Sequence, residues 1–178
     1  NIRFEFGGRY LYKDATWQIN PGEKIGLVGL NGTGKSTLLR IINGEYALES
    51  GEISKIRNLS IGFLNQDLLS YSSGETILEV AMQAFAPTLK LEKEINELLI
   101  KLETDHSDEV LHALHDKQVA FEAADGYNLR PKAEDLLEGL GFSTAELTRP
   151  LDTFSGGWRM RVMLAQMMLQ QPDLLLLD

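Results

Sequence analysis

The chain has 178 residues and a formal net charge of −9, with 43% hydrophobic residues, 24% charged residues and no cysteine. This composition is typical of a globular domain with a sizeable core, and it excludes a disulfide framework, a thiolate metal site and a cysteine nucleophile. The acidic balance disfavours a broad contact with a phosphate backbone, so any nucleic-acid contact is expected to be local. We expect a soluble domain, since no apolar run approaches the roughly 20 residues of a membrane span and the first residues do not resemble a signal peptide.

The first third of the chain has the pattern of strands and turns. Short strands are predicted at residues 2–6, 15–19, 24–28, 51–54 and 59–64. The first two are expected to pair antiparallel, because glycines at 7 and 8 and the turn residues Asn20-Pro21-Gly22 punctuate them. After the third strand, a glycine-rich loop leads into a predicted helix over residues 36–43, which Gly44 closes.

From residue 76 onward the apolar period changes to about 3.6, which indicates helices. The residues expected on one helix face are Leu91, Ile95, Leu98, Leu99 and Leu102. With a polar break at 104–108, residues 89–124 are predicted to form an antiparallel helical hairpin, and residues 132–140 a further helix. The hairpin is either a solvated helix pair or a dedicated contact arm. We divide the chain into residues 1–75, a helical part at 76–153 and a final part at 154–178.

The strongest chemical signal is the stretch from Gly29 to Ser36, which matches G-x-x-x-x-G-K-[ST] between a predicted strand and a predicted helix. Glycines allow successive backbone N–H groups to converge on phosphate oxygens, and the helix N-terminus adds partial positive charge. Lys35 is expected to reach the β- and γ-phosphates, the Ser36 hydroxyl to bind Mg²⁺, and Thr37 to donate to the α-phosphate. An ordinary glycine turn is the alternative. The expected nucleotide contacts in this segment are Gly29, Leu30, Asn31, Gly32, Thr33, Gly34, Lys35, Ser36 and Thr37.

Two further segments support this interpretation. The apolar residues 174–177 end in Asp178, which has the form of a strand that delivers a metal-orienting carboxylate. Ser155-Gly156-Gly157 opens a predicted helix whose N-terminus offers a hydroxyl and backbone donors to an anion, although simple helix capping would use the same residues.

The order of these motifs resembles that of the ABC ATPases, along nearly the whole chain. The resemblance implies an α/β fold: a P-loop NTPase core with an antiparallel β subdomain, and a helical subdomain that carries the inserted hairpin. It implies ATP and Mg²⁺ as cofactors, and Lys35, Gln66 and Asp178 as the residues closest to the chemistry, with Gln66 sensing the metal and the attacking water. Phe6 resembles the aromatic residue that stacks on adenine, although Tyr10 is a nearby alternative for this role. Phe6 could instead be a core residue.

In this family Ser155, Gly156 and Gly157 would contact the γ-phosphate of ATP held by an opposite cassette, so the implied partner is a second ABC cassette. The sequence FSGGWRMR has Trp158 where the family's LSGGQ has glutamine, and it resembles the first cassette of ABC-F proteins. The predicted hairpin and Gly126-Tyr127 also resemble segments of ABC-F proteins. ABC-F proteins are soluble tandem cassettes linked to ribosomes, which implies a cytoplasmic protein with its second cassette in the same chain. Residues 89–124, however, carry four Lys and nine Asp or Glu, a poor electrostatic match for RNA.

Two other function classes stay open: the ATPase subunit of a membrane transporter, and a DNA-repair or chromosome-type ABC ATPase. In the family, a catalytic glutamate, a D-loop and a switch histidine follow the aspartate that corresponds to Asp178. We therefore expect a fragment that binds nucleotide and hydrolyses little, within a parent protein that is an ATPase. His112 and His115 could share a helix face as metal ligands, with His106 nearby, but no cysteine or further histidine completes such a site, so we expect solvated surface.

Overall fold

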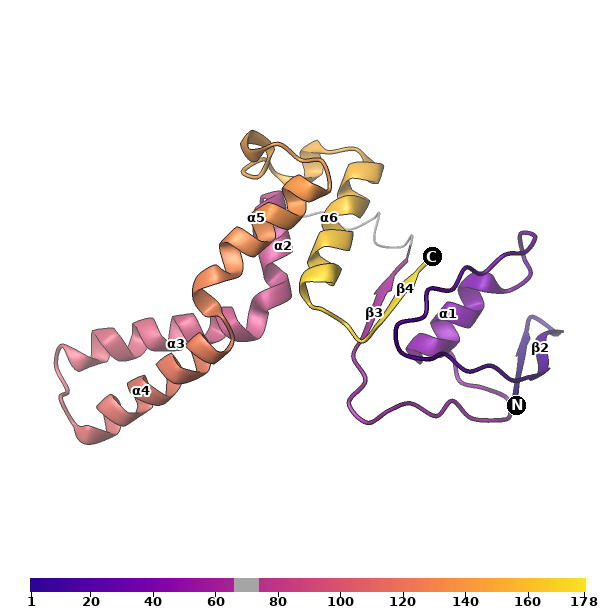
Figure 1. Ribbon diagram of the computed structural model, residues 1–178, viewed down its shortest axis with the longest axis horizontal. Coiled ribbons are helices and arrows are strands. Elements are labelled where there is room, and N and C mark those ends of the chain that lie inside the picture. Colours follow the sequence, from indigo (N-terminus) through magenta and orange to yellow (C-terminus); the bar gives the residue numbers. More distant parts are fainter. Residues whose placement is uncertain (66–73) are drawn as a thin grey trace. The chain divides into compact units, whose positions relative to one another are not determined.

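A computed structural model describes residues 1–65 and 74–178 (Figure 1). The chain divides into two compact units. The first unit consists of residues 1–65 and 172–178, and the second consists of the chain between them. Gln66 lies outside the described residues.

A β-hairpin begins the first unit. Strand β1 (Ile2–Phe6) pairs antiparallel with β2 (Arg9–Ala15), so that Phe6 lies opposite Arg9. Gly7 and Gly8 turn the chain with φ values of 60° and 80°, a left-handed conformation that glycine adopts without a steric cost. The predicted antiparallel pair is confirmed, but its second strand is residues 9–15 and not 15–19. The reason is the tight turn, which starts the ladder immediately at Arg9.

A parallel strand pair and one helix form the rest of the ordered framework in this unit. Strand β3 (Ile61–Leu64) runs beside β4 (Leu174–Leu177) in parallel register. Helix α1 (Lys35–Asn43) packs against this pair and ends at Gly44, whose φ is 91°, as predicted. The buried residues of the shared core are Leu39, Ile42 and Leu176. The apolar run at 174–177 is less buried than its composition indicates, since Leu177 is 55% exposed.

The strands predicted at residues 24–28 and 51–54 do not form. A strand needs a neighbour to complete its hydrogen-bond ladder, and among the described residues no segment pairs with 24–28. The side chain of Val28 is accordingly 98% exposed. Near the second segment, Ser50 forms an isolated antiparallel bridge with Arg3.

The second unit is helical. Its longer helices are α2 (Ile77–Met82), α3 (Ala86–Leu102), α4 (Asp108–Ala123), α5 (Leu129–Gly139) and α6 (Gly156–Leu169). Short 3₁₀ turns occupy Gln83–Phe85, Gly126–Asn128, Thr144–Glu146 and Leu151–Thr153. Among the described residues, no helix combines the length and the apolar composition needed to cross a bilayer.

Helices α3 and α4 form the predicted hairpin and lie side by side (Figure 1). Their shared core consists of Ile95, Leu114 and Phe121. One position of the predicted face is wrong, because Leu99 is 43% exposed near the connection between α3 and α4. The hairpin is therefore held together mainly by the burial of apolar side chains between the two helices.

Helices α2, α5 and α6 pack together beside the hairpin, with Ile77, Leu137 and Val162 completely buried. Helix α5 begins at Leu129, three residues earlier than predicted. Pro131 did not prevent this, because proline is tolerated in the first turn of a helix, where the N–H groups have no intrahelical partner. Gly141 follows the helix with a φ of 100°, as expected of a residue that ends one.

Candidate functional site

The predicted phosphate-binding loop leads directly into helix α1. Gly34 is the N-cap residue, with φ 102° and ψ 10°, and Lys35 is the first helical residue. The Lys35 ammonium donates to the backbone oxygens of Gly29 at 2.8 Å and Leu30 at 3.0 Å, while Thr33 Oγ1 donates to Leu30 O at 2.8 Å. The loop thus places its cation over its own carbonyl groups, beside a helix N-terminus that favours negative charge.

Ser36 and Asp178 meet at the same helix start. Ser36 Oγ donates a hydrogen bond of 2.7 Å to Asp178 Oδ1, which brings the beginning of α1 to the end of β4. A hydroxyl and a carboxylate are the hard oxygen ligands that Mg²⁺ prefers. The donor set therefore fits a magnesium ion, with further positions left for phosphate oxygens and water.

The far end of β4 is held by a second polar cluster. Asp173 Oδ2 accepts from the backbone N–H of Ser60 at 2.9 Å and from its hydroxyl at 2.6 Å. The Ser60 Oγ in turn accepts from the N–H of Asp173 at 2.9 Å. These hydrogen bonds lower the pKa of the Asp173 carboxyl. Because they join the starts of β3 and β4, they fix the register that carries Asp178 to Ser36.

Tyr12, which the sequence analysis did not select, also contacts the loop. Its hydroxyl donates a hydrogen bond of 2.7 Å to Gly34 O, and burial raises the pKa of the phenol. No motif marks this residue. Its position depends on the register of the β1–β2 hairpin, which a linear pattern does not specify.

Both candidates for adenine stacking are surface residues of the first unit. The ring of Phe6 is 59% exposed and lies 6.3 Å from the ring of Tyr46, tilted by 43°. Phe6 is thus not a core residue. Tyr10 is 47% exposed, and its hydroxyl lies 3.5 Å from Glu49 Oε1. Each ring keeps free surface, so the choice between them stays a prediction.

The Ser-Gly-Gly segment begins helix α6 as predicted. Ser155 is the N-cap, with φ −65° and ψ 161°, and its side chain makes no capping hydrogen bond. Gly156 and Gly157 occupy the first helical positions, where backbone N–H groups have no intrahelical acceptor. Ser155 and Gly157 are exposed. The segment therefore presents backbone donors and a hydroxyl on the surface of the second unit.

The Trp158 side chain packs against other residues of the second unit. Its ring meets Phe142 edge-on, with centroids 4.9 Å apart, and the Arg161 guanidinium lies 4.3 Å from the Trp158 ring centroid. Arg161 also donates to Leu140 O at 3.1 Å. The indole is thus enclosed between an aromatic edge and a cation, and it anchors the first turn of α6 to the segment after α5.

The structure brings Lys35, Ser36 and Asp178 together in the first unit, whereas Ser155, Gly156 and Gly157 belong to the second unit. Gln66 falls outside the described residues. Among the described residues, no group of three or more His, Asp or Glu side chains is arranged to hold a metal ion.

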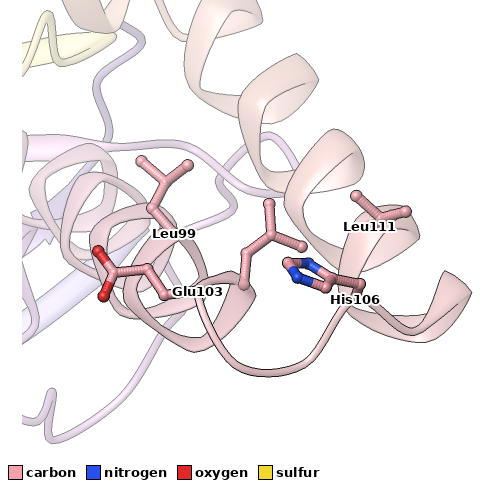
Figure 2. A pocket seen from close by; sticks show the side chains of 5 residues that line it. Leu99, Glu103, His106 and Leu111 are labelled. Atoms are coloured by element: carbon pink, nitrogen blue, oxygen red, sulfur yellow. The ribbon is translucent and has the colours of Figure 1, made fainter.

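The connection between α3 and α4 borders an open hollow with a volume of about 340 Å³. Its lining residues are Leu99, Leu102, Glu103, His106 and Leu111. Figure 2 shows the His106 ring close to Leu111, with Glu103 on the far side of the hollow. His112 and His115 lie on α4 and are exposed.

Comparisons with known proteins agree with this geometry. The family described as "ABC transporter" matches residues 12–178. "ABC transporter F family member 5" of Arabidopsis thaliana is 37% identical over the whole chain, and "Probable ATP-binding protein YheS" of Escherichia coli (strain K12) is 36% identical. The chain spans 26% of the length of each of these two relatives. The resemblance to the ABC-F group is thereby confirmed.

Solved structures confirm the predicted fold class. An ATP-binding cassette dimer in a post-hydrolysis state bound to ADP and Pi has a TM-score of 0.61 and 22% identity, with 99% of this chain and 70% of that chain covered. An inward-facing metal-chelate type ABC transporter has a TM-score of 0.57 and 25% identity, with 100% and 57% covered. The fold is that of a P-loop ABC ATPase cassette.

Proposed function

The chain belongs to the ABC transporter family of ATP-binding cassettes, and from that premise we propose that it binds MgATP at residues 29–37. The observation that carries the proposal is the hydrogen bond of 2.7 Å between Ser36 and Asp178, at the mouth of a loop that also holds the Lys35 ammonium. A cation, backbone donors at a helix start and a pair of oxygen ligands are the groups that a magnesium-bound triphosphate requires.

We assign Lys35, Ser36 and Asp178 their roles from the contacts described above, and Thr37 and Gln66 theirs from the family resemblance. When ATP binds, the Lys35 ammonium exchanges its hydrogen bonds to the loop carbonyls for contacts with the β- and γ-phosphates. Thr37 donates a hydrogen bond to the α-phosphate. Ser36 and Asp178 hold Mg²⁺, which when bound neutralises phosphate charge, and Gln66 adds a further ligand and orients water. The exposed ring of Phe6, or that of Tyr10, stacks on adenine.

The proposal includes a partner cassette. Ser155, Gly156 and Gly157 present a hydroxyl and N–H groups without an intrahelical acceptor, which is suited to the γ-phosphate of a nucleotide bound by another cassette. We propose that the second cassette belongs to the same polypeptide, as the ABC-F resemblance implies. ATP between two cassettes then joins them, and its hydrolysis releases them.

The ABC family is an ATPase family, and we propose ATP hydrolysis for the protein to which this cassette belongs. A cytoplasmic location is part of the same proposal, and the absence of cysteine suits a reducing compartment.

The direct test is calorimetric titration of the chain with ATP in the presence of Mg²⁺. Replacement of Lys35 by glutamine should weaken binding roughly 10- to 100-fold, as expected for the loss of hydrogen bonds to a charged group. Lys93→Gln, at an exposed position of α3, is the matched control and should bind as the unaltered chain does. Equal affinities for the two variants would exclude this loop as the phosphate site.

Action on the ribosome is the finer part of the proposal. Its support is the α3–α4 hairpin, which the sequence resemblance matches to the arm of ABC-F proteins, together with the similarity to ABC-F relatives. The test is cosedimentation of the full-length protein with ribosomes, with and without residues 86–123. Unchanged cosedimentation after removal of the hairpin would argue against the arm, and cofractionation with a membrane-protein partner instead would favour a transporter ATPase.

A further inference from the structure

We propose that Tyr12 is a positioning residue of the phosphate-binding loop. Its hydroxyl holds the peptide between Gly34 and Lys35 in the orientation that presents the Lys35 N–H to a phosphate. The inference rests on the proposed function, since it assigns a task within the same site. Tyr12 itself does not touch the nucleotide in this scheme, because it acts through the backbone.

The geometry begins at the Gly34 oxygen, which accepts two hydrogen bonds. One comes from the Tyr12 hydroxyl at 2.7 Å, and the other comes from the N–H of Leu38 at 2.8 Å. A carbonyl oxygen has two lone pairs, so both are used. The Leu38 bond is the first bond of helix α1, and the Tyr12 bond adds a constraint from outside the helix.

A constraint on this oxygen is also a constraint on the next N–H. The peptide group is planar and trans, so the N–H of Lys35 points opposite to the carbonyl of Gly34. The carbonyl is directed along the helix toward Leu38, and the N–H therefore points out of the helix N-terminus. This is the direction from which a phosphate would approach.

Gly34 is the position where such a constraint has the greatest effect. Its φ of 102° lies in the left-handed region, which glycine enters freely and also leaves freely. A β-carbon at this position would lie 3.0 Å from the Tyr12 hydroxyl and 3.5 Å from Leu11 Cδ1. Strand β2 therefore packs closely on the last glycine of the loop and limits the rotation of the peptide.

The same hairpin carries the exposed ring of Phe6. Tyr12 lies opposite Phe4 in the β1–β2 register, and β1 ends two residues later at Phe6. One hairpin thus connects a candidate base-stacking residue with the loop. Because burial raises the pKa of Tyr12, its phenol remains protonated and able to donate across the neutral range.

The experiment compares two ligands, MgATP and inorganic tripolyphosphate with Mg²⁺, which has no base. Tyr12→Phe keeps the ring and removes the hydrogen-bond donor. It should lower the affinity for both ligands by a similar factor of roughly two- to tenfold, the effect of one neutral hydrogen bond. Tyr127→Phe removes an exposed phenol in the second unit and is the matched control. Phe6→Ala should lower the affinity for MgATP but leave the affinity for tripolyphosphate unchanged.

Thermal unfolding without ligand separates positioning from a structural role. The Tyr12→Phe variant is expected to melt close to the unaltered chain while binding tripolyphosphate more weakly. Unchanged tripolyphosphate binding would overturn the role of Tyr12, and so would a weakening restricted to MgATP. If the unaltered chain bound neither ligand, the proposed function itself would fail, and that result is visible before any variant is compared.

Discussion

Ser36 and Asp178 are 142 positions apart in the chain, yet the hydroxyl of one donates to the carboxylate of the other at 2.7 Å. Helix α1 supplies the first residue at its N-terminus, and the parallel pairing of β4 with β3 supplies the second at a strand end. Two oxygen ligands are therefore brought together by the fold itself. In this arrangement the protein bears the entropic cost of gathering them before a metal binds.

Replacement of Asp178 by asparagine should separate the binding of the metal from the binding of the nucleotide. We expect the affinity for ATP with Mg²⁺ to fall at least about tenfold, because a charged ligand is lost. The affinity without Mg²⁺ should stay the same or rise, since a negative charge near the triphosphate is removed. Titrations with magnesium and with a chelator give the two values. Asp116→Asn on α4 is the control, and equal losses in both conditions would contradict the metal role.

Trp158 should matter for the stability of the second unit. We expect Trp158→Gln, which introduces the glutamine of the family signature, to lower the free energy of unfolding by about 1–2.5 kcal/mol, because it removes the aromatic contact with Phe142 and the cation–π contact with Arg161. Trp158→Phe should lower the free energy of unfolding by less. Urea unfolding followed by circular dichroism measures both.

A double-mutant cycle with Arg161→Ala isolates the pair of Trp158 and Arg161. The expected coupling is about 0.5–1 kcal/mol, as for an exposed cation–π contact. Additive losses within about 0.3 kcal/mol would show that Arg161 only lies near the ring.

Local chemistry explains what the sequence predicted well. The spacing of Gly29, Gly34 and Lys35 depends on neighbouring residues alone, and the helix that follows this loop begins within one residue of its predicted start. The hairpin followed from the 3.6-residue period, because each helix must bury one face. Asp178 was selected for its place after an apolar run, and it does meet Ser36, while its role toward a metal stays a prediction.

Partners distant in sequence explain what the sequence predicted poorly. The segment 24–28 has a strand-like composition, but no described segment pairs with it. Tyr12 reaches Gly34 across 22 positions, through a hairpin whose second strand was predicted at 15–19 and forms at 9–15. Leu99 belongs to the apolar periodicity of α3 but lies near the end of the hairpin, where α4 does not cover it fully. Pairing, register and coverage are tertiary properties, and periodicity contains little information about them.

Asp173 should make the stability of the first unit depend on pH in the acidic range. Hydrogen bonds from Ser60 lower its pKa in the folded state, so the carboxylate stabilises the fold above its ordinary pKa of about 4. That stabilisation is lost as the pH falls through the lowered folded-state pKa. Asp173→Asn should therefore reduce the melting temperature at neutral pH, and the difference from the unaltered chain should shrink as the pH falls below about 4. Melting curves over this range are the measurement, and a difference independent of pH would contradict the role of the charge.

Leu114 provides a test of whether the hairpin and the nucleotide site are independent. Its side chain is 8% exposed and packs with Ile95 and Phe121 between α3 and α4. Leu114→Ala leaves a cavity in this core and should destabilise the hairpin by about 2–5 kcal/mol. Affinity for MgATP should remain unchanged, because Lys35 and Asp178 belong to the other unit.

Hydrogen exchange of the α3 and α4 amides measures the first effect, and calorimetric titration measures the second. Leu111→Ala is the matched control, because Leu111 is 45% exposed on the same helix and should cost much less stability. If Leu114→Ala weakened MgATP binding while Leu111→Ala did not, the hairpin core and the phosphate site would be energetically coupled. That coupling would be a route by which an event at the hairpin reaches the nucleotide.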